Sequence, residues 1–190
     1  MDHHAILDLI LDSRDVTVGG GSASALAGAM AAGLAGMVAR LSTGKACGLP
    51  DPRYLEIAGS AERLATELAA GAVRDSAAYL LIKQAYALPK GTPEEKAVRA
   101  EAIQRAGIAA AAVPLENAGR CAQVRDLCAA LHGQSNPNTG SDLKVADMLC
   151  RAGLEGCLDN IAANLPLIKD GAIRSEFETQ AANLRGAEQP

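Results

Sequence analysis

Residues 19–43 read GGGSASALAGAMAAGLAGMVARLST. Three glycines precede a long stretch of alanine, glycine and leucine, which is typical of a buried helix whose neighbours come very close. Gly28, Ala32 and Gly36 recur every four residues and therefore share one face of this helix. Because a glycine inside a helix costs up to ~1 kcal/mol relative to alanine, this face needs a compensating contact. Two contacts satisfy that need: a helix crossing within the chain, or a seam between two copies of it.

The rest of the 190-residue chain has the composition of a helical protein. Alanine (40 residues) and leucine (23 residues) are abundant, whereas aromatic residues make up only 2%. A β-sandwich or a barrel would contain more aromatic and β-branched residues. We therefore predict an all-α fold, a single helical bundle that occupies residues 1–190 as one domain with essentially no sheet.

Turn signals divide the chain into about six helices, some of them long. Thr92 and Glu95 form a capping box with a proline between them, which marks the start of the fourth helix. Pro114 inside that helix removes a backbone donor and predicts a kink. Ser141 is expected to cap the fifth helix. The helices are predicted at about residues 2–13, 22–43, 51–88, 93–132, 141 to 164 or 169, and 172–184.

Charge and cysteine content exclude several classes of protein. The net charge is −4 and no cluster of Lys and Arg exceeds two residues, so a nucleic-acid partner is not expected. The uncharged stretch 16–39 is long enough to span a bilayer, but its alanine and glycine content favours a buried helix of a soluble bundle over a membrane segment. Five cysteines without a basic leader segment indicate a reducing, cytoplasmic location.

Gly19, Gly20, Gly21 and Ser22 form the first group of candidate binding residues. Flexible glycines at the start of a helix expose backbone N–H groups, and the helix end adds partial positive charge, so the segment can bind an anion or a carbonyl group. It matches neither the Walker loop nor the dinucleotide-binding fingerprint. Taken alone, three glycines before a helix are also typical of a flexible hinge.

Two carboxylates and one lysine are candidates for acid–base work. Asp75 stands with Tyr79 in an alanine-rich helix, where it either faces solvent or lies in a cleft that raises its pKa by desolvation. Asp142 lies in the first turn of the fifth helix, where stabilisation of the helix dipole already explains an acidic residue. Lys45 follows the glycine-rich helix, and it either stabilises that helix end or reaches into a cleft.

Two amides and four cysteines complete the set of candidates. Asn160 and Asn164 lie one helical turn apart, and buried amides can hold a heteroaromatic ring through paired donors and acceptors. Asp142 and Asn160 are ~27 Å apart along a straight helix, so they serve different parts of a long ligand or sites on two subunits. We interpret the remaining spaced pairs as buried thiols rather than a metal site: Cys121 with Cys128, and Cys150 with Cys157.

Six segments of the chain follow one another in a specific order: residues 19–25 with 37–38 and 44–45, 75–79, 88–96 with 99, 114–115, 141–146, and 156–160 with 164–165. In this order they resemble the cyclodeaminase/cyclohydrolase family. This family comprises the C-terminal domain of formiminotransferase-cyclodeaminase and stand-alone methenyltetrahydrofolate cyclohydrolases. The chain departs from the family pattern at Val18, where proline is usual, and at Ala46-Cys47, where basic or aromatic residues are common.

The resemblance implies an all-helical homodimer that binds a folate with a pterin ring and a glutamate tail, and that needs neither a cofactor nor a metal. It favours a catalytic role for three residues: Asp142, Asp75 and Lys45. It favours substrate binding by seven: Gly19, Gly20, Gly21, Ser22, Tyr79, Asn160 and Asn164.

The activity that the resemblance implies is the reversible hydrolysis of 5,10-methenyltetrahydrofolate to 10-formyltetrahydrofolate. Asp142 or Asp75 would stabilise the cationic bridge and take a proton from water, while Lys45 would stabilise charge or shuttle a proton. One alternative is a formiminotetrahydrofolate cyclodeaminase that releases ammonia. A second is a folate-binding helical dimer without enzymatic activity.

Overall fold

A computed structural model describes residues 2–186 and contains helices but no strand over that range. The all-α prediction is therefore confirmed. Six α-helices follow one another in the chain, with one 3₁₀ turn on either side of α5. Their bounds are α1 His3–Leu11, α2 Gly20–Ser42, α3 Asp51–Ala87, α4 Pro93–Leu131, η1 Pro137–Thr139, α5 Gly140–Asn164, η2 Leu165–Leu167 and α6 Gly171–Gly186.

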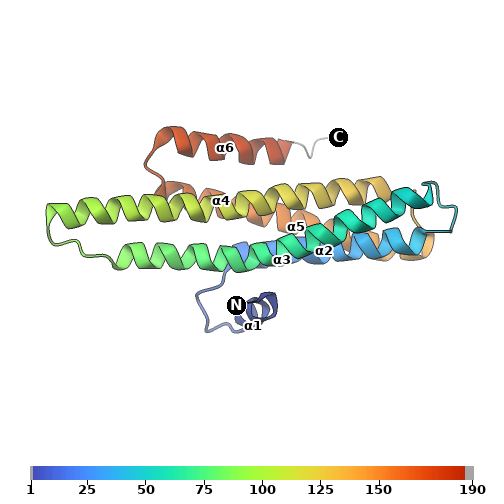
Figure 1. Ribbon diagram of the computed structural model, residues 1–190, viewed down its shortest axis with the longest axis horizontal. Coiled ribbons are helices and arrows are strands. Elements are labelled where there is room, and N and C mark those ends of the chain that lie inside the picture. Colours follow the sequence, from blue (N-terminus) through green and yellow to red (C-terminus); the bar gives the residue numbers. More distant parts are fainter. Residues whose placement is uncertain (1, 187–190) are drawn as a thin grey trace.

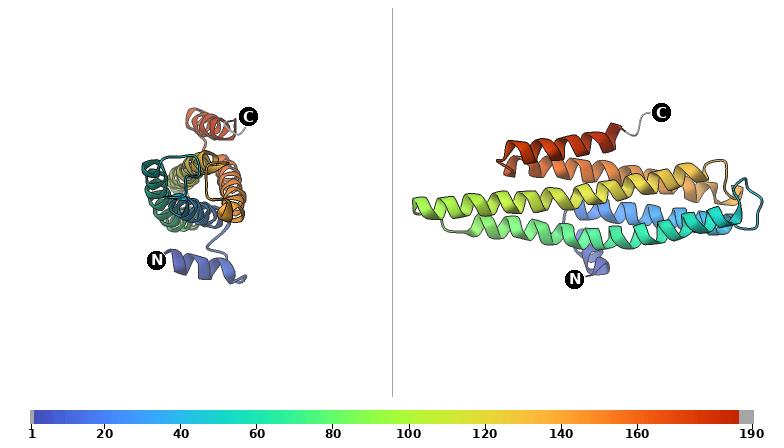
Figure 2. Two further views of the ribbon diagram at one scale, coloured as in Figure 1. Left: turned by 90° about the vertical axis from the view of Figure 1, so that its right-hand side faces the viewer. Right: turned by 45° about the horizontal axis from the view of Figure 1, so that its top comes forward.

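Helices α2 to α5 form an antiparallel four-helix bundle, which the end-on view in Figure 2 shows as a ring. The hairpin of α3 and α4 is longer than its neighbours and projects beyond them at one end of the bundle (Figure 1). Helices α1 and α6 lie on opposite sides of the bundle. Two sections of the bundle therefore differ: one has four helices around a core, and the other has only α3 and α4.

The start of α4 was predicted correctly, and that of α5 was not. Thr92 and Glu95 form the predicted capping box of α4, and this helix continues through Pro114 to Leu131. The prediction that Ser141 caps α5 is wrong, because the helix begins at Gly140 and Thr139 is its N-cap residue. The 3₁₀ turn η1 leads directly into the helix, and the Thr139 hydroxyl donates to the Asn136 carbonyl.

The small residues of α2 are explained by contacts within the chain. A β-carbon at Gly28 would lie 2.5 Å from Cys121 Sγ, and one at Gly36 would lie 3.3 Å from the Ala61 β-carbon. Ala32 between them is fully buried. The alternative interpretation of this face as a seam between two copies is therefore wrong, because α3 and α4 already occupy it.

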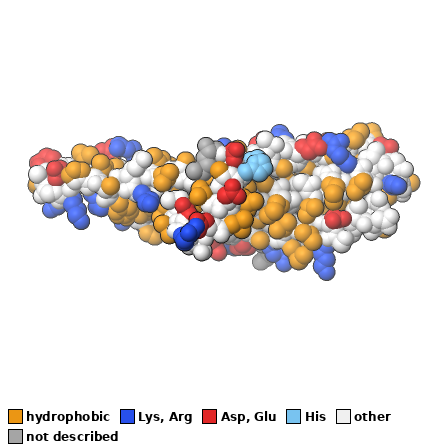
Figure 3. All heavy atoms as spheres, turned by 90° about the horizontal axis from the view of Figure 1, so that it is seen from below, with side chains coloured by type: hydrophobic (Ala, Val, Ile, Leu, Met, Phe, Trp, Pro, Cys, Tyr) orange, Lys and Arg blue, Asp and Glu red, His pale blue; other side chains and the backbone are white. Residues whose placement is uncertain are grey.

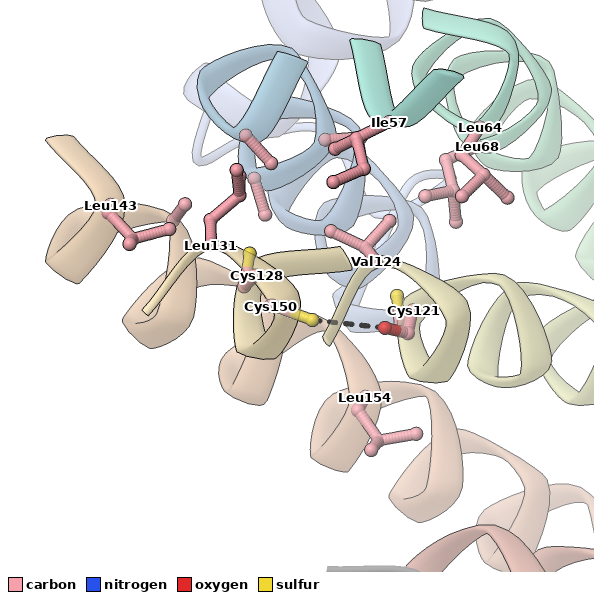
Figure 4. Packing of buried hydrophobic residues seen from close by; sticks show 14 of the residues in the cluster. Ile57, Leu64, Leu68, Cys121, Val124, Cys128, Leu131, Leu143, Cys150 and Leu154 are labelled. Carbon is pink, nitrogen blue, oxygen red and sulfur yellow. Dashed lines mark hydrogen bonds between the residues drawn. The ribbon is translucent and has the colours of Figure 1, made fainter. Parts of the chain in front are cut away.

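The core of the bundle is built from leucine, alanine, isoleucine and buried cysteines (Figure 4). Cys121 and Cys150 face each other across α4 and α5, and the Cys150 thiol donates to the Cys121 carbonyl at 3.0 Å. Burial is the principal cause that raises the pKa of Cys150 to about 12, so this thiol stays protonated. These cysteines therefore act as small apolar residues.

By length and composition, α2 alone among the described helices is apolar enough to cross a membrane, but half of its most hydrophobic window is buried inside the bundle. It contacts α3, α4 and α5, which is the environment of a central core helix. Its apolar character is thus accounted for by packing.

The first testable prediction concerns the close crossing at Gly28. Gly28→Ala should destabilise the protein by about 1–3 kcal/mol, because the new methyl group overlaps a sulfur atom in a closed core. Gly119→Ala in α4 is the matched control, since a β-carbon there meets nothing within 4 Å. The control should be neutral or stabilising. Urea unfolding of both variants measures the difference, and equal stability of the two would contradict the close crossing.

A candidate active site at the start of α2

A cavity of about 290 Å³ lies where the first turn of α2 meets α3, α4 and the end of α5. Its walls combine backbone, carboxylate, amide and aromatic groups with aliphatic side chains. The lining residues are Val16, Thr17, Gly19, Gly20, Gly21, Asp75, Tyr79, Ile82, Ala110, Asn160 and Asn164. Six of the seven predicted substrate-binding residues therefore line one cavity, and the seventh, Ser22, contacts its carboxylate.

Asp75 is the carboxylate of this cavity. The hydroxyl of the fully buried Ser22 lies 2.9 Å from Asp75 Oδ2 and 3.0 Å from the Ala72 carbonyl oxygen, so its single proton is shared between them. The Asn160 amide donates to the other carboxylate oxygen, Oδ1, at 3.4 Å. Each carboxylate oxygen thus accepts one hydrogen bond from a side chain.

Burial raises the pKa of Asp75 above its ordinary value, and hydrogen bonds from the Ser22 hydroxyl and backbone N–H partly oppose that rise. Desolvation penalises the charged carboxylate, whereas donors to the charged form favour it. A carboxylate whose pKa lies closer to neutrality is a better proton acceptor. Of the two environments considered for Asp75, a solvent-exposed face and a cleft, the structure contains the cleft.

Gly21 makes the close approach of α2, α3 and α5 possible. A β-carbon at this position would lie 1.7 Å from Asn160 Nδ2 and 2.5 Å from Asp75 Oδ1. Gly19 and Gly20 have no such neighbours within 4 Å and form open backbone at the mouth of the cavity. The three glycines therefore differ in role: one brings the polar side chains together, and two leave backbone accessible to a ligand.

The Asn160 amide is held in place by a chain of hydrogen bonds that starts at Pro114. In a regular helix the N–H four residues later would bond the Ala110 carbonyl, but Pro114 has no N–H. Asn164 Nδ2 donates to this carbonyl at 3.0 Å and also to Asn160 Oδ1 at 3.0 Å. The Asn160 Nδ2 group consequently faces Asp75.

The other two predicted catalytic residues lie elsewhere in the chain. Lys45 follows the last turn of α2, and Asp142 lies in the first turn of α5. Hydrogen bonds from Asn136 to the Ser42 hydroxyl and the Leu41 carbonyl hold these two segments together at one end of the bundle. Since α2 rises 1.5 Å per residue, that end is ~30 Å from Gly21. One chain therefore does not bring Lys45 or Asp142 to Asp75.

Three contributions to the cavity were not predicted: Val16 and Thr17, Ile82, and the Ala110 carbonyl. Ile82 follows Tyr79 by three residues and therefore shares its helix face, so helical periodicity could have predicted it. The proline at position 114 signals a free carbonyl at position 110, four residues earlier. The loop residues before α2 have no comparable signal.

The arrangement suits reactions on a positively charged, partly aromatic ligand. A carboxylate that lies half-buried can stabilise a cationic carbon and accept a proton from water beside it. Tyr79 and Ile82 supply an adjacent wall for an aromatic group. Among residues 2–186, no group of three or more His, Cys, Asp or Glu side chains is placed to bind a metal ion.

Comparisons with known proteins identify the family to which this helical bundle belongs. A profile of the family described as Formiminotransferase-cyclodeaminase matches residues 7–183. A methenyltetrahydrofolate cyclohydrolase of Methylorubrum extorquens is 36% identical over 173 residues, which are 87% of this chain and 80% of that protein. The formimidoyltransferase-cyclodeaminase of Sus scrofa is 30% identical over 179 residues, but the match covers only 32% of its length.

The fold is also known in a solved structure. The crystal structure of formiminotetrahydrofolate cyclodeaminase from Thermotoga maritima superposes with a TM-score of 0.81 and 26% sequence identity, and the match covers 93% of this chain and 85% of that one. The fold and the site define an all-helical bundle with a half-buried carboxylate, Asp75, in its cavity. The chain belongs to the formiminotransferase-cyclodeaminase family.

The second testable prediction follows from the pKa of Asp75. Because its folded-state pKa is raised, the carboxylate costs stability as pH rises from the ordinary Asp value through the raised one. Asp75→Asn removes that cost, so the variant should gain stability relative to the wild type as pH increases from about 4 to about 7. Urea unfolding at a series of pH values measures it.

Asp8→Asn provides the control for this prediction, because Asp8 is exposed on α1. Its substitution removes the same charge at an exposed position outside the cavity, so it controls for the loss of one negative charge. An Asp75→Asn variant that instead loses stability as pH rises would show that the carboxylate holds the helices together in its charged form.

Proposed function

We propose that this protein hydrolyses 5,10-methenyltetrahydrofolate to 10-formyltetrahydrofolate and catalyses the reverse reaction. The observation that carries the proposal is the Asp75 carboxylate, which lies in a cavity with Ser22 and Asn160 as hydrogen-bond donors. The 36% identity to a methenyltetrahydrofolate cyclohydrolase over most of both chains supports the same reaction.

In the proposed mechanism, Asp75 lies beside the bridging carbon that joins N5 and N10 of the substrate. Its negative charge stabilises the delocalised cation, and its free lone pair accepts a proton as water adds to the carbon. The tetrahedral adduct then opens by cleavage of its bond to N5, which yields the 10-formyl product and releases one proton overall. The bridging carbon is already electrophilic, so no cofactor or metal takes part.

The remaining cavity groups position the folate. Tyr79 and Ile82 contact the aromatic part of the ligand, and the open backbone of Gly19 and Gly20 offers N–H groups to the pterin ring. The second candidate reaction is the deamination of 5-formiminotetrahydrofolate. It forms methenyltetrahydrofolate, the substrate of the hydrolysis, and it is the activity named for the Thermotoga maritima structure. The higher identity to the cyclohydrolase favours hydrolysis.

We also propose that the active form is a homodimer in which the partner supplies Lys45 and Asp142. The outer face of α2 is exposed and apolar: Met30 and Met37 are 55% and 38% exposed, and a β-carbon at Gly33 would meet nothing within 4 Å. Figure 3 shows a field of hydrophobic side chains on this side of the bundle, beside α1. A second copy would cover it.

A two-fold axis at Gly33 would join the two halves of the predicted site. Gly33 is twelve residues from Gly21 and twelve from Lys45. Antiparallel pairing of α2 with its copy about this point places Lys45 of one subunit next to the cavity of the other. Asp142 accompanies Lys45, because Asn136 fixes the start of α5 to the end of α2.

The cytoplasmic location stays a prediction.

The third testable prediction concerns the reaction itself. Purified protein mixed with methenyltetrahydrofolate should remove its near-ultraviolet absorbance faster than buffer does. Asp75→Asn should fold normally and lose ~10²–10⁴-fold in turnover, the usual contribution of a general base. Offering 5-formiminotetrahydrofolate and measuring ammonia separates the two reactions: release of ammonia without hydrolysis supports the deaminase, and turnover in neither mixture supports a folate-binding dimer.

The fourth prediction tests the shared site by mixing inactive variants. If Asp142 acts on the partner's cavity, a mixture of the Asp75→Asn protein and the Asp142→Asn protein should regain about a quarter of wild-type turnover. Half of the randomly formed dimers then contain one subunit of each kind, and each of these dimers has one intact site. Asp142→Asn mixed with Lys45→Ala is the matched control and should stay inactive, because both changes affect the same half. No recovery in the first mixture, or full activity of Asp142→Asn alone, would contradict the shared site.

A further inference from the structure

The hydroxyl group of Ser22 lies behind the candidate active site, between Asp75 and the backbone of α3. Ser22 is fully buried and does not line the cavity, although Gly21 beside it does. Among the described residues, its Oγ atom has two acceptors within hydrogen-bond distance: Asp75 Oδ2 at 2.9 Å and the Ala72 carbonyl oxygen at 3.0 Å. A hydroxyl group has one proton, so at any moment it donates to one of the two.

The two acceptors of this proton differ in charge. Asp75 Oδ2 shares a negative charge while the carboxylate is ionised, whereas the Ala72 carbonyl is always neutral. A hydrogen bond to an ionised acceptor is roughly twice as strong as one between neutral groups. The Ser22 hydroxyl therefore donates to Asp75 as long as Asp75 is charged. Once Asp75 is neutral, the Ala72 carbonyl competes for the proton, because a carbonyl inside a helix keeps a second lone pair.

The two oxygens of Asp75 lie in different surroundings. Oδ2 contacts Ser22, which is closed off from the cavity, whereas Oδ1 contacts the amide of Asn160, which lines the cavity. The contact from Asn160 is also the longer one, at 3.4 Å. Oδ1 is thus the oxygen on the cavity side and the more weakly held of the two, so it is the atom to which a proton from the cavity is transferred.

Few other titratable groups face the Asp75 carboxylate. Within the described part of the chain, Asp75 and Tyr79 are the only titratable side chains that line the cavity, and the lining residues of α2, α4 and α5 are uncharged. Asp15, in the loop before α2, bonds within its own turn. The proposed dimer adds the partner's Lys45 and the partner's Asp142. Within one chain, the group that responds directly to the charge of Asp75 is therefore the Ser22 hydroxyl.

We propose that Ser22 is a positioning residue that turns its proton from Asp75 Oδ2 to the Ala72 carbonyl when Oδ1 takes a proton from the reacting water. This inference rests on the proposed function. It gives Ser22 a role toward Asp75 in place of the predicted contact with the substrate. It also divides the work of the carboxylate, because Oδ1 exchanges protons with the cavity and Oδ2 holds the side chain in place.

The proton transfers balance over one turnover. As the water oxygen bonds to the bridging carbon, one water proton passes to Oδ1, and the neutral acid lets the Ser22 hydroxyl turn to Ala72. When the bond from the carbon to N5 breaks, the proton on Oδ1 passes to N5. The adduct hydroxyl releases its own proton to solvent as it becomes the formyl oxygen. Asp75 is charged again, and Ser22 turns back to Oδ2.

This arrangement keeps a buried hydroxyl paired in both states of the base. A buried hydroxyl without a partner costs the full desolvation penalty of the group. Here only the Ser22 proton moves, and the surrounding dipoles are already in place, so the change of charge needs little reorganisation. Burial raises the pKa of Asp75, and Ser22 supplies the hydrogen bonds that oppose this rise. The contact thus moderates the basicity of Asp75 as well as its direction.

The fifth prediction separates this role from substrate binding. Ser22→Ala should leave KM within about twofold of the wild type, because Ser22 does not line the cavity. The acid limb of the kcat profile should move upward by about one pH unit, because ionised Asp75 loses a charge-assisted donor. Ser22→Thr keeps the hydroxyl and should retain the wild-type profile, and the weaker donor in Ser22→Cys should give an intermediate shift.

Ser24→Ala is the control for the kinetic measurement. It removes a hydroxyl two residues away that donates to the Gly20 carbonyl at 2.7 Å and contacts no carboxylate. Its pH profile should match that of the wild type. A raised KM with an unchanged pH profile in Ser22→Ala would overturn the proposal and show that Ser22 binds the substrate.

Urea unfolding tests the same switch without turnover. The stability lost in Ser22→Ala should grow as pH rises from about 4 to about 7, because the charged carboxylate loses more than the neutral acid does. In the Asp75→Asn background the loss should be independent of pH. Ser42→Ala is the matched control, since Ser42 is also fully buried and donates to a carbonyl, that of Val38, at 2.8 Å.

A loss in Ser22→Ala that does not change with pH would overturn the switch, because the hydroxyl would then not follow the charge of Asp75. Absence of turnover in the wild type would overturn the proposed function instead. The unfolding measurement would still decide whether Ser22 responds to Asp75, so the two failures can be told apart.

Discussion

The approach of three helices at Gly21 is the constraint on which the rest of the structure depends. The position tolerates no β-carbon, because an amide and a carboxylate occupy that space. Helix α2 begins without a side-chain cap of its own, and the Ser22 hydroxyl and backbone N–H in its first turn bind Asp75 instead. A carboxylate at a helix start is stabilised by the local N–H groups and by the helix dipole. The same contact therefore satisfies the start of α2 and positions the half-buried Asp75 carboxylate. It also offsets part of the free-energy cost of burying that carboxylate.

Close packing along α2 extends this constraint through the bundle. Glycines at positions 28 and 153 let α2 and α5 touch backbone to backbone: a β-carbon at Gly153 would lie 2.9 Å from the Gly28 nitrogen. With so few large side chains between them, small shifts of one helix would overlap its neighbour. Such a core fixes the register of Asn160 on α5 against Gly21 on α2. The site is thus rigid because of residues that never touch the ligand.

The sequence predicted the fold more fully than the site. Capping residues, prolines and glycines are local signals, and they placed the long helices because each acts within one turn of its own position. The distance between Asp142 and Asn160 could also be predicted, because both residues lie on one helix, α5. Two features could not be predicted in this way: the cleft around Asp75, and the packing of the Gly28 face against helices of the same chain. Both depend on contacts between α2, α3, α4 and α5, which local patterns do not encode.

Pro114 shows how a local defect becomes a feature of the site. A proline inside a helix normally leaves a carbonyl without its donor, which is costly when the carbonyl is buried. Here Asn164 satisfies the Ala110 carbonyl with the amide that also binds Asn160 Oδ1. That second bond determines which end of the Asn160 amide faces Asp75, because an amide that accepts through oxygen must present nitrogen elsewhere. The carboxylate therefore receives one side-chain donor on each oxygen, from Ser22 and from Asn160, in addition to the Ser22 backbone N–H, and a lone pair is left to face the cavity. The orientation of the base is set on α4, by the missing N–H of a residue that is not itself in the cavity.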